Sequence, residues 1–259
     1  MVDIHSHVLP GLDDGARTLD ESLEMLRIAA RSGTTDIVAT PHINTEFRNE
    51  RAQIQEAYRR LCEEANGIIK IHLGCDFHLS YENLMQALAE PQNYTINGQQ
   101  YLMVELPDLL AFPAIRDALR QLLSSGIIPV ITHPERNMSL QPKLEELESW
   151  VKQGALVQVT AQSLTGRFGP AAKRAADSLL SAKLVHFVAS DAHDCFDRTP
   201  DLSAAFHYVH SRCSRQDAEL LFTHNPAATL TGEPLPQTQK PGRKFFGLFS
   251  RAKSPAGQL

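Results

Sequence analysis

Apolar stretches recur along the chain, and each is followed by a segment with helical periodicity. Several stretches are almost continuous in Val, Ile and Leu, as in Ile127-Ile-Pro-Val-Ile-Thr132. Such runs are typical of parallel strands that are buried on both faces. The pattern predicts seven strands, at residues 2–7, 36–42, 68–79, 100–106, 127–133, 155–160 and 184–190.

Amphipathic segments between these runs predict helices at residues 19–32, 47–66, 81–90, 114–125, 143–153 and 170–182. Gly33, Gly67, Gly126 and Gly154 stand where helices should end. Alternating strands and helices imply right-handed units and a parallel sheet. We therefore expect an α/β fold, a distorted TIM-like barrel with seven strand–helix units. An open doubly wound sheet is the alternative, although the first turn lacks the GxGxxG of a dinucleotide-binding version.

The end of the chain has a different composition. Two more helices are predicted at 202–211 and 214–222, and from about Gly232 the sequence is rich in Pro, Gly, Gln, Ser and Lys. We expect one domain over residues 1–232 and a mostly disordered tail over 233–259. Residues 243–251 of the tail are basic and apolar together, a composition that suits docking on a partner or an anionic surface but favours a sticky tail without a specific partner.

The overall composition narrows the class of protein. A chain of 259 residues with 42% hydrophobic residues suits one large soluble domain, and a net charge of -5 argues against a general nucleic-acid binder. The four cysteines are widely scattered without a CxxC, which indicates free thiols in a reducing cytoplasm. The chain begins with strand-like sequence rather than a signal peptide, and it has no membrane-spanning apolar run. A cytoplasmic location is expected.

Polar residues gather where the predicted strands end. His5 and His7 lie two residues apart, so on a strand both side chains project from the same face and can bind one metal ion. The ends of other strands carry Thr40-Pro-His42, Asp76, Glu105, His133-Pro-Glu-Arg136 and Ser190-Asp-Ala-His193. The strand at 155–160 ends with weaker candidate site residues, the uncharged Thr160 and Gln162.

Each of these residues taken singly suits a structural role, but their agreement in position indicates a site. Carboxylates and neutral imidazoles crowded at one buried rim need cations to compensate their charge, and mixed N/O ligation suits Mn, Fe or Zn. His78 is a second-rank candidate ligand. The remaining histidines are interpreted as structural or surface residues: His72, His186, His207, His210 and His224.

The ordered set of motifs resembles the PHP superfamily, named for polymerase and histidinol phosphatase. The Gly11-Leu-Asp-Asp-Gly15 element narrows the resemblance to bacterial capsule and exopolysaccharide protein-tyrosine phosphatases of the CpsB/YwqE type. The resemblance covers residues 1 to about 230. It implies a distorted (β/α)7 barrel with three divalent metal ions, commonly manganese.

The resemblance also implies a role for each matching residue. The implied metal ligands are His5, His7, Asp14, His42, Asp76, Glu105, His133, Asp191 and His193. Arg136 and Arg198 match phosphate-binding arginines of the family. Asp76 departs from the pattern, because the family usually has Glu there.

The implied reaction is metal-dependent hydrolysis of phosphotyrosine. No cysteine is followed by Arg at the Cys-x5-Arg spacing of cysteine phosphatases, which fits a metal-activated hydroxide as nucleophile. The implied partner is the phosphotyrosine-bearing tail of a membrane tyrosine autokinase. The alternatives are a small-molecule phosphatase such as a histidinol-phosphate phosphatase, a nuclease of the same superfamily, and a non-catalytic metal-bound docking protein. The sequence is also compatible with a homo-oligomer.

Overall fold

The strands all run parallel and form two sheets. The computed structural model describes residues 1–47, 49–107, 109, 111–141 and 143–236. One sheet has the order β1-β2-β4, from Val2–Ser6, Asp36–Ala39 and Lys70–Leu73. The other has the order β3-β5-β6-β7-β8-β9, from His42–Ile43, Asp76–His78, Tyr101–Glu105, Ile128–Thr132, Leu156–Thr160 and Phe187–Ala189. The predicted α/β class with parallel strands is confirmed, while closure into a barrel stays a prediction.

Two of the predicted strands are interrupted, so that prediction was wrong in detail. The run at 36–42 becomes β2 and β3, and the run at 68–79 becomes β4 and β5. Pro41 stands at the first break and has no N–H to donate to a ladder. Gly74 stands at the second, where a Cβ would lie 3.3 Å from side-chain atoms of both Ile96 and Val38. Each break shifts the chain from one sheet to the other.

The two sheets are joined where β1 meets the chain after β9. Ser6 and Ala192 form an isolated parallel bridge. Beside it, the N–H of His7 donates to the carbonyl of Ala192 and the N–H of Asp191 donates to the carbonyl of His5, both at 2.8 Å. These bonds bring the first and last strands of the chain together.

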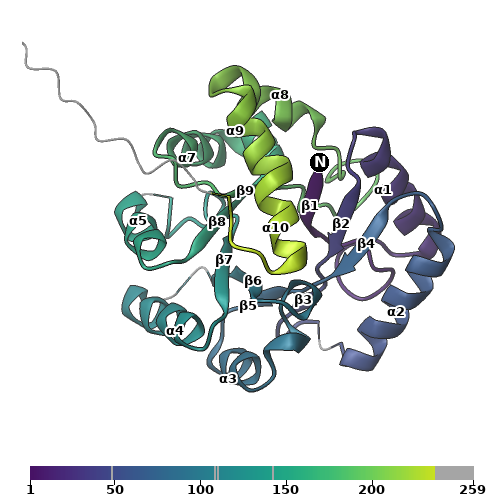
Figure 1. Ribbon diagram of the computed structural model, residues 1–259, viewed down its shortest axis with the longest axis horizontal. Coiled ribbons are helices and arrows are strands. Elements are labelled where there is room, and N and C mark those ends of the chain that lie inside the picture. The colour runs from purple at the N-terminus through teal and green to yellow at the C-terminus, as the bar shows by residue number, and fades with distance from the viewer. Residues whose placement is uncertain (48, 108, 110, 142, 237–259) are drawn as a thin grey trace, which may run out of the picture.

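Helices cover the outside of the sheets (Figure 1). In chain order they are α1 (Leu19–Arg31), α2 (Arg51–Glu64), α3 (Tyr81–Ala89), α4 (Phe112–Ser124), α5 (Leu144–Lys152), α6 (Ala161–Thr165), α7 (Gly169–Ser181), α8 (Ser203–Arg212), α9 (Arg215–Glu219) and α10 (Asn225–Thr231). Short turns η1 (Pro91–Asn93) and η2 (Ile96–Gly98) precede β6, and a π-helical turn, η3 (Leu220–His224), leads into α10. The sequence did not predict α6 or these turns, because segments of three to five residues carry little periodicity.

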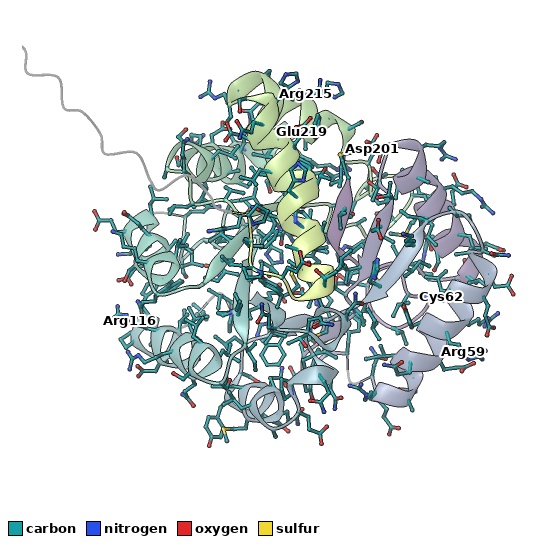
Figure 2. The ribbon with its side chains drawn as sticks, viewed as in Figure 1. Arg59, Cys62, Arg116, Asp201, Arg215 and Glu219 are labelled. Atoms are coloured by element: carbon teal, nitrogen blue, oxygen red, sulfur yellow. The ribbon has the colours of Figure 1, made fainter. Side chains whose placement is uncertain are left out.

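The charged side chains of these helices point to solvent. Figure 2 shows Arg59, Arg116 and Arg215 at the periphery of the molecule. Arg215 pairs with Glu219 one turn along α9, with Nε and Oε1 2.8 Å apart. Exposed pairs of this kind contribute little to stability. The core lies instead between helices and sheets, around Trp150 on one side and Met25 and Leu61 on another.

The N-terminal ends of the strands are closed by apolar side chains. Val2, Ile4, Val38, Tyr101 and Phe187 belong to one buried cluster, and Leu230 of α10 packs against it. Figure 1 shows α10 crossing the strand ends on the side where the N-terminus lies. This packing leaves the C-terminal strand ends as the edge that carries polar groups.

The first residues of the predicted tail contact the domain. Glu233 accepts a hydrogen bond from the Tyr101 hydroxyl at 2.6 Å, and Leu235 packs on the apolar cluster. Residues 237–259, including the basic and apolar stretch 243–251, lie outside the described residues. All four cysteines are free. No described helix combines the length and apolar character that a membrane crossing requires.

Candidate metal centre

Neighbouring parallel strands place several predicted metal ligands side by side. His5 is on β1, and His7 follows its end. His42 on β3 is paired directly with Asp76 on β5, and their Nδ1 and Oδ2 atoms lie 3.2 Å apart. Glu105 closes β6 beside them. The order of the parallel strands thus assembles side chains that are up to a hundred residues apart in the sequence.

Two site residues have unusual backbone conformations. His133 follows β7 with φ 33°, and Asp191 follows β9 with φ 52°. Residues with a side chain rarely adopt this left-handed region, and such strain tends to persist at functional sites. Both side chains contact the cluster at the strand ends: the ring centroids of His133 and His5 lie 5.6 Å apart, and Asp191 Oδ1 lies 3.6 Å from His5 Nε2.

The Gly11-to-Gly15 element folds directly against His7. The N–H of Ala16 donates to the carbonyl of His7 at 3.0 Å. A Cβ at Gly15 would lie 2.1 Å from that carbonyl oxygen, so only glycine permits the approach. The close packing carries Asp13 and Asp14 onto the site.

Seven of the nine predicted metal ligands form three overlapping groups, each with donor atoms within 4.8 Å of one another. Among the described residues these groups are His7, Asp14, His42 and His193; His5, His7 and Asp76; and His42, Asp76 and Glu105. The two other predicted ligands adjoin the groups. Asp191 Oδ1 lies 3.6 Å from Nε2 of both His5 and His7, and His133 Nε2 lies 3.8 Å from Glu105 Oε1.

Several of the donor atoms are buried and lack hydrogen-bond partners. His5 Nε2, His7 Nε2, His42 Nδ1 and both carboxylate oxygens of Asp76 are in this condition. The separation of His42 Nδ1 from Asp76 Oδ2 is 3.2 Å, at the upper limit of a hydrogen bond, and that of His5 Nε2 from Asp76 Oδ2 is 3.7 Å, beyond it. Two ligands of one ion, each about 2.1 Å from it, stand roughly 3.0–3.4 Å apart. The donor set therefore fits divalent metal ions.

Second partners orient three of the imidazoles. Nδ1 of His5 lies 3.0 Å from Oε1 of Gln158, Nδ1 of His7 lies 2.8 Å from Oδ2 of Asp13, and Nδ1 of His193 lies 2.9 Å from the carbonyl of Asp191. Each acceptor fixes the proton on Nδ1 and leaves Nε2 with a free lone pair for a metal.

Sequence reasoning missed Asp13 and Gln158 in this role. Asp13 adjoins the predicted ligand Asp14 in an acid pair, and either residue could have been the ligand. Gln158 is a polar residue inside the apolar strand Leu156-Val-Gln-Val-Thr160, and it is fully buried. A buried amide in such a strand needs a partner, which was the available signal.

The electric field of the site favours positive charge. Burial would lower the pKa of His42, but Asp14 and Asp76 outweigh it and raise the pKa to about 11. Burial likewise opposes protonation of His7, yet Asp13 and Asp191 raise its pKa to about 9. The carboxylates thus attract cations strongly, whether protons or metal ions.

His133 differs from the other site histidines. Burial and the nearby Arg136 lower its pKa to about 4. Its ring therefore stays neutral at ordinary pH, which is the state that binds metal. His78, the second-rank candidate, lies outside the three groups, with Nδ1 3.5 Å from Glu105 Oε2.

Both predicted arginines converge on one carboxylate. Arg136 Nη1 and Arg198 Nη2 each contact Oδ2 of Asp191, the latter at 2.7 Å. The other oxygen of Asp191 faces His5 and His7. Asp191 is buried, while the arginine side chains keep about a quarter of their surface exposed, 26% and 24%. The guanidinium groups thus stand beside the ligand cluster and remain accessible.

Histidines that the sequence assigned to structure lie elsewhere. His72 Nε2 lies 3.0 Å from Asp36, and His186 Nδ1 accepts from the N–H of Val157 at 3.1 Å. His207, His210 and His224 belong to α8 and η3. None of the five is in the metal-ligand groups of the described chain.

Fold and site together define the class: a parallel α/β protein with candidate metal ligands clustered at the C-terminal strand edge. Within that class, the chain belongs to the capsular polysaccharide synthesis family CpsB/CapC, whose profile matches residues 1–231. The family expected from the sequence motifs is confirmed.

The relatives carry the activity in their names. The tyrosine-protein phosphatase YwqE of Bacillus subtilis is 36% identical over 96% of this chain and 100% of its own length. The tyrosine-protein phosphatase CpsB of Streptococcus agalactiae is 29% identical over 89% of this chain and 98% of its own. A solved structure from work on YwqE and on CpsB of Streptococcus pneumoniae, described as metal-dependent tyrosine phosphatases, superimposes with a TM-score of 0.86 at 33% identity. That match covers 94% of this chain and 100% of the solved chain.

Proposed function

We propose that the protein is a metal-dependent protein-tyrosine phosphatase. The observation that carries the proposal is Asp191, whose two oxygens face the imidazole cluster on one side and two guanidinium groups on the other. A phosphate ester bound there would meet metal ions and arginines together. The named activity of the relatives supports the same reaction.

Three overlapping ligand groups support three metal positions, and their mixed N/O donors suit manganese, with iron and zinc as alternatives. The proposed ligands are the nine predicted from the sequence: His5, His7, Asp14, His42, Asp76, Glu105, His133, Asp191 and His193. Asp76 reaches both His5 and His42 despite being one methylene shorter than Glu. Divalent ions held by these residues would supply a bound water of lowered pKa and positive charge to neutralise phosphate oxygens.

The protein's own groups bind and orient the phosphate. Arg136 and Arg198 donate to its equatorial oxygens in the fork geometry that guanidinium provides. Asp191 holds both arginines in place through Oδ2. Gln158 and Asp13 keep the imidazoles of His5 and His7 in the ligating tautomer.

The thiols take no part in this scheme. Cys75 is buried, and burial raises the pKa of its thiol well above the usual value. Burial also raises the pKa of Cys62, Cys195 and Cys213. A thiolate nucleophile needs a lowered pKa, so these cysteines are unsuited to covalent catalysis.

We further propose that the strands make a distorted (β/α)7 barrel. β2 with β3, and β4 with β5, count as two interrupted strands, so nine segments correspond to seven. The Ser6–Ala192 bridge between the first and last strands supports closure. The proposed active site then lies at the C-terminal mouth, where such barrels carry their chemistry.

The proposed substrate is the phosphotyrosine-bearing tail of a tyrosine autokinase of polysaccharide assembly, with the enzyme in the cytoplasm. Membership of a capsular polysaccharide synthesis family supports this choice. The free thiols suit a reducing compartment.

The test compares three substrates: a phosphotyrosine peptide, histidinol phosphate and single-stranded DNA. We expect hydrolysis of the peptide, loss of activity with a chelator, and recovery with Mn²⁺. Preferential hydrolysis of histidinol phosphate or DNA would replace the proposal with the corresponding alternative. Metal binding without hydrolysis of any of the three would indicate a docking protein, and chelator-resistant activity would exclude the metal mechanism.

A further inference from the structure

The segment after β8 supplies an aromatic ring to the two site arginines. Phe168, between α6 and α7, lies with its ring centroid 4.4 Å from Cζ of Arg136. The same ring lies 5.7 Å from Cζ of Arg198. These arginines come from different loops, after β7 and after β9, and both lie over the same aromatic ring. Both distances are within the range of a cation–π contact.

The segment that carries Phe168 is hydrogen-bonded to both loops that carry the arginines. Glu135, the residue before Arg136, accepts from the Thr160 N–H at 3.0 Å and from the Ser163 hydroxyl at 2.7 Å. On the other side, Gln162 donates to the carbonyl of Asp197, the residue before Arg198, at 2.8 Å. The segment 160–168 is therefore tied to the chain next to each arginine.

Two further contacts fix the segment. Arg167 Nη2 pairs with Asp197 Oδ1 at 2.6 Å, and Lys173 Nζ donates to the carbonyl of Leu164 at 2.8 Å. Glu135 is fully buried, and burial raises its pKa to about 7, although the Ser163 and Thr160 bonds oppose the shift. Phe168 thus follows a segment that is bonded to both loops carrying the arginines.

The aromatic ring reduces the electrostatic cost of placing the two arginines close together. Two guanidinium groups repel each other, and Asp191 Oδ2 is one small acceptor for both. An aromatic face attracts both cations without offering a hydrogen bond that would compete with phosphate. The ring can hold the arginine planes, and the N–H groups that do not donate to Asp191 can turn to a phosphate.

We propose that Phe168 is a positioning residue for phosphate recognition: its ring holds Arg136 and Arg198 in the geometry that binds the phosphoryl group. The inference rests on the proposed phosphatase function for its kinetic part. Its binding part, affinity for inorganic phosphate, stands without catalysis.

The test uses the full-length, metal-loaded protein with Phe168→Leu, which removes the π face but keeps an apolar side chain, and with Phe168→Tyr, which keeps the face. Inorganic phosphate binding is measured by calorimetry, kcat and KM are measured on a phosphotyrosine peptide, and metal content and Tm are measured in parallel. Phe168→Leu should weaken phosphate binding and lower kcat/KM by roughly tenfold, as expected for losing two partly exposed cation–π contacts. Phe168→Tyr should remain near wild type, and metal content and Tm should not change.

A second variant checks that the ring acts through the arginines. In an Arg198→Lys background, Phe168→Leu should cause a smaller further loss than it does in the wild type, because part of the contact is already gone. Fully additive losses would overturn the proposal, as would unchanged phosphate affinity in Phe168→Leu. Loss of metal or a lowered Tm in Phe168→Leu would overturn it in favour of a structural role.

The two proposals fail differently. If the wild type does not hydrolyse phosphotyrosine but Phe168→Leu still weakens phosphate binding, the phosphatase function is wrong and the role of Phe168 stands. If hydrolysis occurs and Phe168→Leu is neutral in both assays, only the role of Phe168 is wrong.

Discussion

The two ends of the parallel strands have opposite chemistry. At the N-terminal ends, Val2, Ile4, Tyr101 and Phe187 form a closed apolar cluster. At the C-terminal ends, equally buried imidazole and carboxylate atoms lack hydrogen-bond partners. The same strands therefore contribute stability at one end and bear an electrostatic cost at the other, which bound cations can offset.

Substitutions at the two ends of the strands should therefore have different effects. Apolar truncation at the N-terminal ends removes packing and should affect unfolding without changing the chemistry. Polar changes at the C-terminal ends should affect metal binding and turnover more than folding.

The largest effect is expected from His5→Ala combined with His7→Ala. Losing two ligands should remove metal and lower kcat/KM on the order of 10⁴-fold, because metal ions supply several kcal/mol of transition-state stabilisation. Metal analysis and peptide hydrolysis measure the change. His210→Ala, on α8, is the matched control and should behave as wild type. Full activity in the double variant would show that the histidines are not ligands.

Phe187→Ala should be the largest change at the apolar end. The side chain is fully buried, so we expect a loss of about 3–5 kcal/mol in the free energy of unfolding. Metal content and kcat of the folded protein should not change. Urea unfolding measures stability, with Phe196→Ala as the control because that side chain is 84% exposed. Loss of metal in Phe187→Ala would mean that the two ends are coupled.

The imidazole of His186, just before β9, should make the free energy of unfolding depend on pH. Burial lowers its pKa to about 4 from the ordinary value of 6.5. The unfolded state therefore binds the proton more readily, and the contribution of neutral His186 is lost as the pH falls from 6.5 to 4. The stability lost through this residue should reach about 3 kcal/mol below that window.

The contribution of His186 can be separated from that of the metal site by comparing wild type with His186→Asn in unfolding experiments across this pH range. Asn retains an acceptor for the Val157 N–H but does not titrate. The difference in free energy of unfolding between the two proteins should change with pH in the stated direction. A constant difference would contradict the shifted pKa.

Gly15→Ala should give the smallest of these effects, yet act only at the polar end. A Cβ would meet the His7 carbonyl at 2.1 Å and displace the loop that carries Asp13 and Asp14. A displacement of about 1 Å can cost a hundredfold in rate. Gly67→Ala is the control: no atom crowds its Cβ, and its φ of 78° should cost about 1–2 kcal/mol of stability without affecting kcat/KM. Equal kcat/KM in Gly15→Ala and wild type would refute the packing argument.

Sequence patterns predicted much of this arrangement for clear reasons. Continuous apolar runs gave the strands, since burial on both faces leaves no alternation, and helix ends fell near Gly33 and Gly126. The interruptions at Pro41 and Gly74 were missed, because apolar character continues through both. Predicted ligands stood at strand ends because parallel strands present their C-terminal ends at one edge.

The sequence by itself determined which residue types stand at that edge and, through the ordered motifs, the family. Tertiary structure alone decided which of them meet. Asp13 and Gln158 orient imidazoles, Asp191 joins the arginines to the histidines, and Phe168 underlies both arginines. The strand at 155–160 ends with the weakest candidate site residues in the sequence, yet the segment after it supplies the Phe168 ring. These contacts join residues distant in the chain, so their distances and angles follow from packing, which no local pattern encodes.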